Sequence, residues 1–156
     1  MSIEQLEETA QAMVAPGKGI IAVDESNATI GKRFAAVGVE NTEEHRRAYR
    51  EMLLTTPRLG EHISGAILYD ETLRQATRTG VPFTRIMTEA GILPGIKVDK
   101  GPVPLAGFPG DVVTEGLDGL RPRLKEYAAL GAKFAKWRAV IAITEDTPSG
   151  TCIESN

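Results

Sequence analysis

The chain has 156 residues, of which 42% are hydrophobic and 25% are charged, proportions typical of folded globular proteins. This length suits one domain over residues 1–156, and a net charge of −3 argues against a general nucleic-acid-binding protein. The sequence has no apolar run long enough for a membrane span, and its lone Cys152 favours a reducing, cytoplasmic location.

Helical and strand patterns alternate along the chain. A capping box at Ser2 and Gln5 predicts the first helix. In chain order, we expect a helix up to Pro16, a strand at 19–24, a helical patch through Arg33, a helix from about 42 to 54, a strand at 63–69, an interrupted helix at 73–89, a strand at 95–99, a helix marked by apolar residues from 117 to 128, a strand at 134–143, and the start of a further helix at 148–154.

This alternation predicts an α/β fold with right-handed βαβ units and a parallel sheet. The strand at 19–24 is uniformly apolar before its last residue, so we expect it to be fully buried. Residues 100–118 are rich in Gly and Pro and show no clear period. Loops of this length in compact domains are usually functional or locally folded.

Charged residues stand at the ends of three predicted strands. Asp24 ends the first strand, Lys97 and Asp99 end the third, and Lys136 and Arg138 lie in the fourth. Alternation along a strand places Lys97 with Asp99 on one face, and Lys136 with Arg138 on one face. Charges in strands that are covered on both sides cost free energy unless they are paired or used.

Two explanations of these charges stay open. They are structural ion pairs, for example Asp24 with Lys136, or they form a site for an anionic ligand. Arg and Lys are the usual phosphate-binding side chains, and barrel sites lie at the carboxyl ends of strands. The segment 24–29 fits either a phosphate at a helix N-terminus or plain capping by Ser26 and Thr29. One cysteine and two separated histidines do not make a zinc site, so we expect no metal and no cofactor.

Longer strings occur in order over almost the whole chain. They are Ala15-Pro-Gly-Lys-Gly-Ile-Ile-Ala-Val-Asp-Glu-Ser26, Gly38-Val-Glu-Asn-Thr-Glu-Glu44, Ile63-Ser-Gly-Ala-Ile-Leu68, Pro94-Gly-Ile-Lys-Val-Asp-Lys-Gly101, Gly116-Leu-Asp-Gly-Leu120 and Phe134-Ala-Lys-Trp-Arg138. With these spacings the chain closely resembles class I fructose-bisphosphate aldolase. The Ser26-Asn27-Ala28 variant is similar to the plastid and bacterial branches of that family.

The resemblance implies a (β/α)₈ TIM barrel, of which this chain supplies the first four βα units, and a lysine Schiff-base mechanism. Asp24 would help the Schiff-base chemistry, and Lys136 would support it electrostatically. The residues that the resemblance places near the substrate are Lys97 and Arg138 on the phosphate of the aldehyde side, Ser26, Thr29 and Arg33 close by, and Arg46 as a lesser contact. The implied partner is a sugar phosphate.

In the family, the Schiff-base lysine lies on strand six and a glutamate needed for dehydration and hydrolysis lies on strand five. Neither position occurs in these 156 residues. We therefore expect fructose 1,6-bisphosphate cleavage only when a C-terminal half completes the barrel. The alternatives are an inactive fragment and a noncatalytic half-barrel that binds sugar phosphates. Open edges at the first and fourth strands favour a homo-oligomer or pairing with a C-terminal half.

Overall fold

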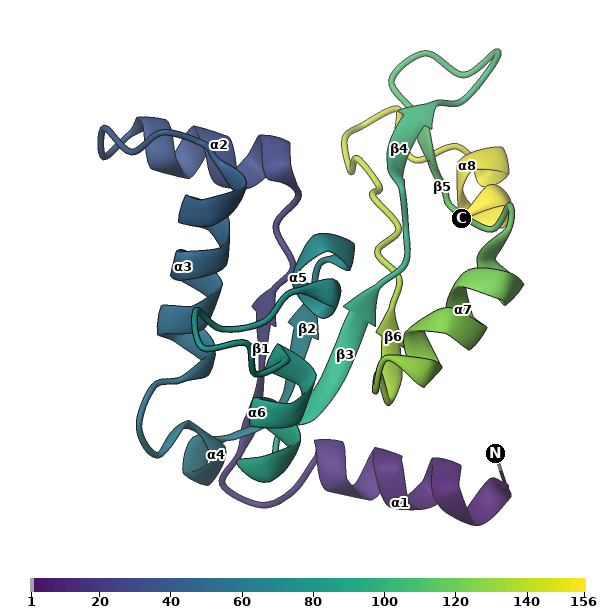
Figure 1. Ribbon diagram of the computed structural model, residues 1–156. Helices are drawn as coiled ribbons and strands as arrows, with labels where there is room; N and C mark the ends of the chain where they lie inside the picture. Colours follow the sequence, from purple (N-terminus) through teal and green to yellow (C-terminus); the bar gives the residue numbers. More distant parts are fainter. Residues whose placement is uncertain (1) are drawn as a thin grey trace. The chain divides into compact units, whose positions relative to one another are not determined.

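The structure, a computed structural model, describes residues 2–156 and has an α/β architecture (Figure 1). Its elements are α1 (Ile3–Met13), β1 (Gly19–Val23), α2 (Asn27–Ala35), α3 (Glu43–Leu54), α4 (Leu59–His62), β2 (Ile63–Leu68), α5 (Asp70–Arg74), α6 (Phe83–Glu89), β3 (Leu93–Lys97), β4 (Gly101–Pro104), β5 (Val112–Glu115), α7 (Leu120–Ala129), β6 (Phe134–Lys136) and α8 (Gly150–Ser155). The prediction of an α/β fold is confirmed.

Local capping chemistry explains where several helices begin. Ser2 and Gln5 form the predicted capping box of α1. Thr42 caps α3, because its hydroxyl oxygen accepts the His45 N–H at 3.1 Å. The predicted interruption within 73–89 also occurs, since α5 and α6 are separate helices.

The chain divides into two compact units. The first, unit 1, contains the residues up to Lys97 together with 125–135. Among the described residues, its sheet has the strand order β1-β2-β3-β6. Strand β1 pairs parallel with β2, and β2 pairs parallel with β3. The prediction of a parallel sheet is confirmed for these three strands.

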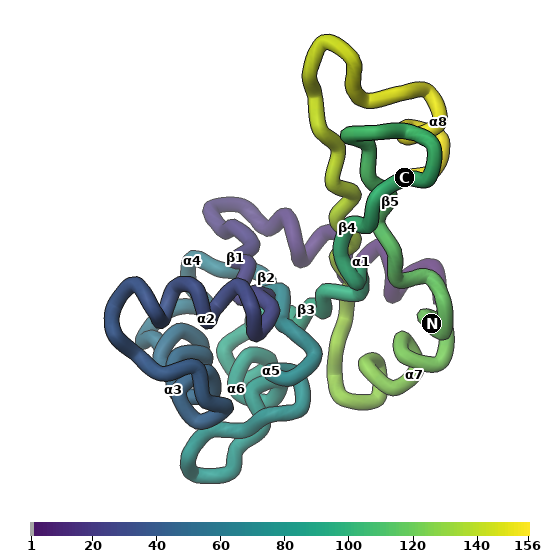
Figure 2. Tube along the Cα trace, turned by 90° about the horizontal axis from the view of Figure 1, so that it is seen from above, coloured from purple at the N-terminus to yellow at the C-terminus, as the bar shows by residue number. Residues whose placement is uncertain are grey.

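Helices cover one face of this sheet. Val23, Leu68 and Ile96 stand in one row of the register, and each is at most 2% exposed. Helices α5 and α6 contact β3, and α3 contacts α6. Figures 1 and 2 agree that α2, α3, α5 and α6 lie on the same side of strands β1–β3. The apolar core of unit 1 therefore lies between this face and these helices.

The prediction of a fully buried first strand is wrong. Within β1 only Val23 is buried, and Ile20 is 42% exposed. Strand β1 lies at the end of the strand order, and the helices of unit 1 cover one face of it. An apolar sequence shows that a strand can be buried on both faces, but it does not show what covers the second face.

The predicted fourth strand is also too long, because β6 ends at Lys136 rather than at residue 143. The third strand lies two residues earlier than predicted, at Leu93–Lys97. Asp99 and Arg138 therefore lie beyond the ends of their strands. The expected sharing of a strand face by each pair of charges does not hold, because alternation applies only within a strand.

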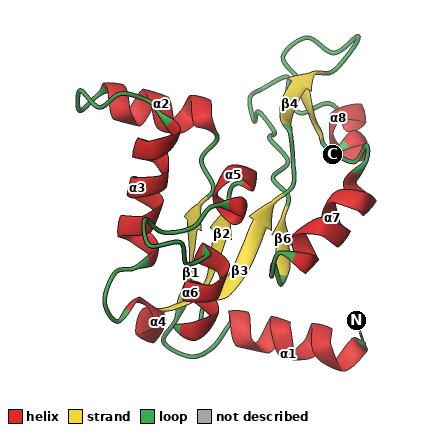
Figure 3. Ribbon diagram, viewed as in Figure 1, coloured by secondary structure: helices red, strands yellow, loops and turns green. Residues whose placement is uncertain are grey.

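The second compact unit, unit 2, contains residues 98–124 and 136–156. The stretch predicted as a loop holds an antiparallel hairpin of β4 and β5, drawn in yellow in Figure 3. Helix α8 is fastened to β5 through Asn156, whose side chain accepts the Thr114 N–H and donates to the Val112 carbonyl, both at 2.9 Å. Ser149 caps α8, and its own N–H donates to Asp111 at 3.0 Å.

Candidate active site

The carboxyl ends of β1 and β3 bring two of the predicted site residues to one level of the sheet. Val23 is in register with Leu68, and Leu68 is in register with Ile96. The next residues along β1 and β3 are Asp24 and Lys97. Lys97 is the last residue of β3, so alternation along the strand points it away from the helices, whereas Asp24 lies one residue beyond the end of β1. Two strand spacings, about 10 Å, separate the backbones of Val23 and Ile96, the residues just before Asp24 and Lys97.

This second face of the sheet is apolar, and an aromatic ring lies across part of it. A Cβ atom at Gly95 would lie 2.3 Å from the Phe134 ring, and one at Gly65 would lie 3.1 Å from it. The absence of side chains at these two glycines thus makes room for the ring. Asp24 is 8% exposed and Lys97 is half-buried, so both charges lie at the edge of a largely apolar surface.

The segment after Asp24 turns directly into α2. The Ser26 Oγ accepts the Thr29 N–H at 3.3 Å, and the two hydroxyl groups lie 3.1 Å apart. In the structure, therefore, both side chains take part in the helix cap. Thr29 is exposed and Ser26 is half-buried.

Glu25 binds two arginines. Its carboxylate forms ion pairs with Arg33 of α2 and with Arg50 of α3. Burial raises the pKa of Glu25, but hydrogen bonding and the charges of the arginines outweigh it, so the pKa lies below its usual value. Arg33 remains exposed over 59% of its side chain, whereas the Arg50 side chain is 3% exposed.

Arg46 belongs to a second cluster on the same helices. Its guanidinium donates to both carboxylate oxygens of Glu71, at 2.8 and 2.7 Å, and to the Asn41 side chain at 3.0 Å. Asn27 donates to Glu71 at 3.3 Å. The hydrogen bond from Arg46 lowers the pKa of Glu71 and, in turn, raises the pKa of Arg46. The helix face that contains Arg46 is consequently a network of paired charges.

The predicted site residues are divided between the two units. Asp24, Ser26, Thr29, Arg33, Arg46 and Lys97 belong to unit 1, and Lys136 and Arg138 belong to unit 2. Within unit 2, Lys136 is the last residue of β6, and its backbone carbonyl accepts the Val98 N–H at 3.0 Å. Arg138 is exposed two residues beyond that strand.

Sequence reasoning missed several charged residues around these positions. Glu25, Arg50 and Glu71 partner the arginines of unit 1. In unit 2, Arg123 donates to the Val98 carbonyl at 3.1 Å and also to the Gly116 carbonyl, so it holds the chain just after β3. Arg50 had a usable signal, because a charged residue one turn before Leu54 falls on the apolar face of α3.

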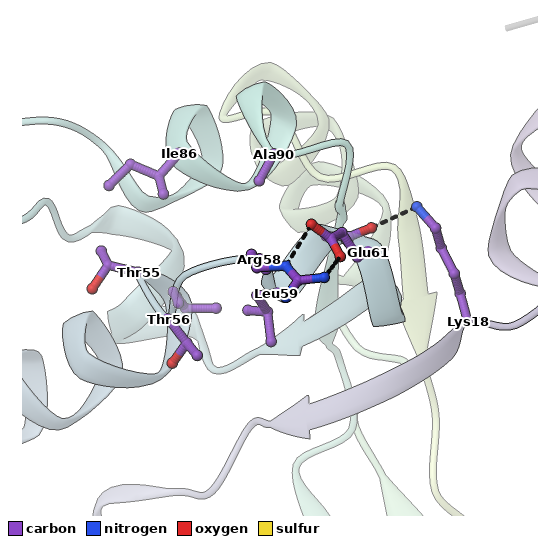
Figure 4. A pocket seen from close by; sticks show the side chains of 10 residues that line it. Lys18, Thr55, Thr56, Arg58, Leu59, Glu61, Ile86 and Ala90 are labelled. Atoms are coloured by element: carbon purple, nitrogen blue, oxygen red, sulfur yellow. Dashed lines mark hydrogen bonds and ion pairs between the residues drawn. The ribbon is translucent and has the colours of Figure 1, made fainter.

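A pocket of about 520 Å³ lies at the other end of the unit 1 strands (Figure 4). It is next to Lys18, which precedes β1, and α4, which precedes β2. The Lys18 Nζ donates to the Gly60 carbonyl at 2.5 Å, and Arg58 pairs with Glu61. Barrel active sites lie at the carboxyl ends of strands. We therefore assign this amino-terminal pocket to packing between α4 and its neighbours.

No helix within residues 2–156 has both the length and the apolar character needed to cross a membrane. This finding agrees with the absence of a long apolar run in the sequence.

Comparison with known proteins gives consistent results. Residues 5–156 match the family model described as "Glycolytic: Fructose-bisphosphate aldolase class-I". The chain is 74% identical over its whole length to a probable fructose-bisphosphate aldolase class 1 of Xanthomonas campestris, covering 47% of that protein. It is 57% identical to fructose-bisphosphate aldolase 1, chloroplastic, of Chlamydomonas reinhardtii, over 90% of this chain and 37% of that protein. The chain thus spans about half the length, or less, of the curated relatives it matches.

A solved structure of fructose-bisphosphate aldolase from Plasmodium falciparum, in complex with TRAP and a small-molecule inhibitor, is also similar. It superimposes with a TM-score of 0.95 at 48% identity, covering 97% of this chain and 44% of that one. The likeness confirms the prediction that the chain folds as part of a TIM barrel. By the family model and by these identities, the chain belongs to the class I fructose-bisphosphate aldolases.

Proposed function

We propose that this chain contributes the strands of a fructose 1,6-bisphosphate aldolase site that hold one phosphate and support the Schiff base. The complete site would cleave the sugar bisphosphate into glyceraldehyde 3-phosphate and dihydroxyacetone phosphate. The observation that carries the proposal is the placement of Asp24 and Lys97 at the carboxyl ends of β1 and β3, each directly after a residue of the buried row Val23, Leu68 and Ile96. Family membership supports the same reaction.

The proposed roles follow from the charges. Lys97 would hold the phosphate of the aldehyde product, because an ammonium group is a strong point donor to phosphate oxygens. The Asp24 carboxylate would exchange protons at the Schiff base, and its low exposure would strengthen its interaction with the positively charged imine. Lys136 would support the chemistry electrostatically near the reacting carbons. Arg138 would hold the same phosphate as Lys97. Ser26, Thr29, Arg33 and Arg46 are proposed as weaker contacts.

The imine-forming lysine would come from a segment that supplies strands five to eight. Imine formation makes the substrate carbon electron-poor, so the nitrogen accepts the electrons of the carbon–carbon bond as that bond breaks. The partners proposed here are accordingly a sugar phosphate and either a C-terminal half or further copies of the chain. The proposed location is cytoplasmic.

A fused chain tests this function. The 156 residues would be joined to the part of the Xanthomonas campestris relative that lies beyond the matched segment. We expect cleavage of fructose 1,6-bisphosphate, and borohydride trapping of dihydroxyacetone phosphate on the added segment. K97M should raise KM strongly and D24N should lower kcat. K100M, which changes an exposed lysine three residues away, is the matched control. Borohydride labelling at Lys97 or Lys136 would contradict the assigned roles.

Calorimetry on the 156-residue chain distinguishes the noncatalytic alternative. A half-barrel that only binds sugar phosphates would take up glyceraldehyde 3-phosphate, lose that affinity in K97M, and give no cleavage in the fused chain. An inactive fragment would show no binding of glyceraldehyde 3-phosphate by the 156-residue chain alone.

A further inference from the structure

Arg50 is a charged side chain in the core of unit 1. The residue is 2% exposed and lies on α3, one helical turn before the buried Leu54. A guanidinium group at such a position is costly unless several of its N–H groups are bonded. Its bonding partners therefore indicate why the sequence has an arginine there.

Arg50 binds one residue in two ways. Its Nη1 donates to the Glu25 carboxylate, and its Nη2 donates to the Glu25 backbone carbonyl at 3.1 Å. The planar fork of an arginine can hold both oxygens at once, whereas the ammonium group of a lysine is a single point. The contact therefore fixes both the side chain and the main chain of Glu25.

Glu25 directly follows Asp24, and the residues on either side of this pair are also fixed. Val23 is in register with Leu68 of β2, and Ser26 caps α2. Asp24 thus lies between strand β1 and Glu25, whose backbone carbonyl is held by Arg50. The Arg50 contact to the Glu25 carbonyl therefore acts on the backbone next to Asp24.

We infer that Arg50 is a positioning residue for Asp24. The inference rests on the proposed function, since it assigns Arg50 a role in the step that Asp24 serves. Arg50 acts through the backbone, from α3, and the Glu25 carboxylate compensates its charge inside the core. A purely structural ion pair would stabilise the fold without setting the direction of Asp24.

The decisive comparison is between R50K and R47M. R50K keeps the positive charge but loses the two-pronged contact. Arg47 lies on the same helix and pairs with Glu51. R47M therefore serves as the control for loss of an arginine from α3. R50M removes the positive charge as well as the two-pronged contact. If R50M does not fold, R50K alone tests whether Arg50 positions Asp24.

In the fused chain we expect R50K to lower kcat by about tenfold or more, because small misplacements of reacting groups cost that much. KM should change little, because the phosphate contacts stay in place. R47M should leave kcat and KM unchanged. Equal kcat values for R50K and R47M would overturn the inference.

A second measurement does not depend on the proposed function. In the 156-residue chain, the amide NMR signals and hydrogen exchange of Asp24, Glu25 and Ser26 should change in R50K and stay constant in R47M. If the fused parent chain is inactive, the proposed function fails, while this measurement still decides whether Arg50 fixes the segment. Unchanged signals in R50K would overturn the inference on their own.

Discussion

Two arginines that the family resemblance places near the substrate are held by carboxylates in this structure. Arg33 pairs with Glu25, and Arg46 makes a two-point contact with Glu71. A phosphate that used either arginine would compete with an existing partner. Arg33 is the easier of the two to recruit, because its side chain is 59% exposed whereas that of Arg46 is 13% exposed.

The Arg46–Glu71 contact should make stability depend on pH. The pKa of Glu71 is lower in the folded chain than its ordinary value of 4.5. The contact therefore stabilises the fold above that value, and its contribution is lost as the pH falls through the lowered pKa. We expect E71Q to reduce the free energy of unfolding by about 1–2 kcal/mol near neutral pH. Urea unfolding measures this difference in the free energy of unfolding between the parent chain and E71Q. The difference should become smaller below about pH 4.

E61Q is the control for that experiment. Glu61 pairs with Arg58 on the surface, where the two side chains are 51% and 75% exposed. Exposed ion pairs contribute little to the free energy of unfolding. E61Q should therefore have the same free energy of unfolding as the parent chain, near neutral pH and at acidic pH. A gap between E71Q and the parent that stays constant from neutral to acidic pH would contradict the assigned role of Glu71.

At the scale of single elements, two capped helices differ in how much of their surface is buried. Helix α1 has a complete capping box, yet none of its described residues is buried. Helix α3 begins at a capping threonine and buries Arg50 and Leu54. The same kind of cap should therefore matter for α3 far more than for α1.

We expect T42A to lower the free energy of unfolding by about 1 kcal/mol, as is typical for loss of a capping hydroxyl. S2A should loosen α1 but leave the cooperative transition unchanged, since α1 contributes little buried surface. Circular dichroism during urea unfolding measures both effects. Equal losses in the two variants would show that α1 packs more tightly than this structure indicates.

The contact of Phe134 with Gly95 gives a further test. G95A would force a Cβ atom into the ring and should cost about 1–3 kcal/mol. F134L should recover part of that loss in a double-mutant cycle. G19A is the control, because no atom lies within 4 Å of a Cβ added there. Additive effects of G95A and F134L would contradict the contact.

The sequence predicted the elements that depend on local signals. The capping box of α1 uses two residues three positions apart, Ser2 and Gln5, and strand β2 is a short run of mostly apolar and small residues. The hairpin of β4 and β5 was missed because Pro102 and Pro104 disfavour a strand and only pairing with β5 reveals one. The predicted strand over 134–143 was too long, because a strand-like residue pattern does not show where pairing with the neighbouring strand ends.

For the candidate site, the sequence predicted the residues at strand ends but not the partners of the arginines. Asp24 and Lys97 follow from strand ends in the sequence, and the register places the residues just before them, Val23 and Ile96, in one row. The partners of Arg33 and Arg46 depend on how α2, α3 and α5 pack, with Glu71 separated from Arg46 by 25 positions. No spacing rule along one chain identifies such a pair.

For the molecule as a whole, the exposed end of the sheet is the main feature. Strand β1 lies at one end of the strand order, and Ile20 is 42% exposed. An edge strand with apolar side chains pairs readily with other chains. We expect the 156-residue chain to self-associate with rising concentration in sedimentation experiments, and I20K to shift it toward the monomer. A parent chain that stays monomeric at all concentrations would contradict this prediction.

The ring of Phe134 against Gly65 and Gly95 also has an evolutionary consequence. A Cβ atom at Gly95 would lie 2.3 Å from the ring, so a larger residue there requires a smaller one at 134, whereas at Gly65 the distance is 3.1 Å and a small shift of the ring suffices. Across aldolase sequences, positions 95 and 134 should therefore vary together. A homologue with alanine at 95 is expected to have a smaller side chain than phenylalanine in β6. Ancestral reconstruction along a branch where such an exchange occurred would show which substitution came first, and the smaller residue at 134 should precede the alanine.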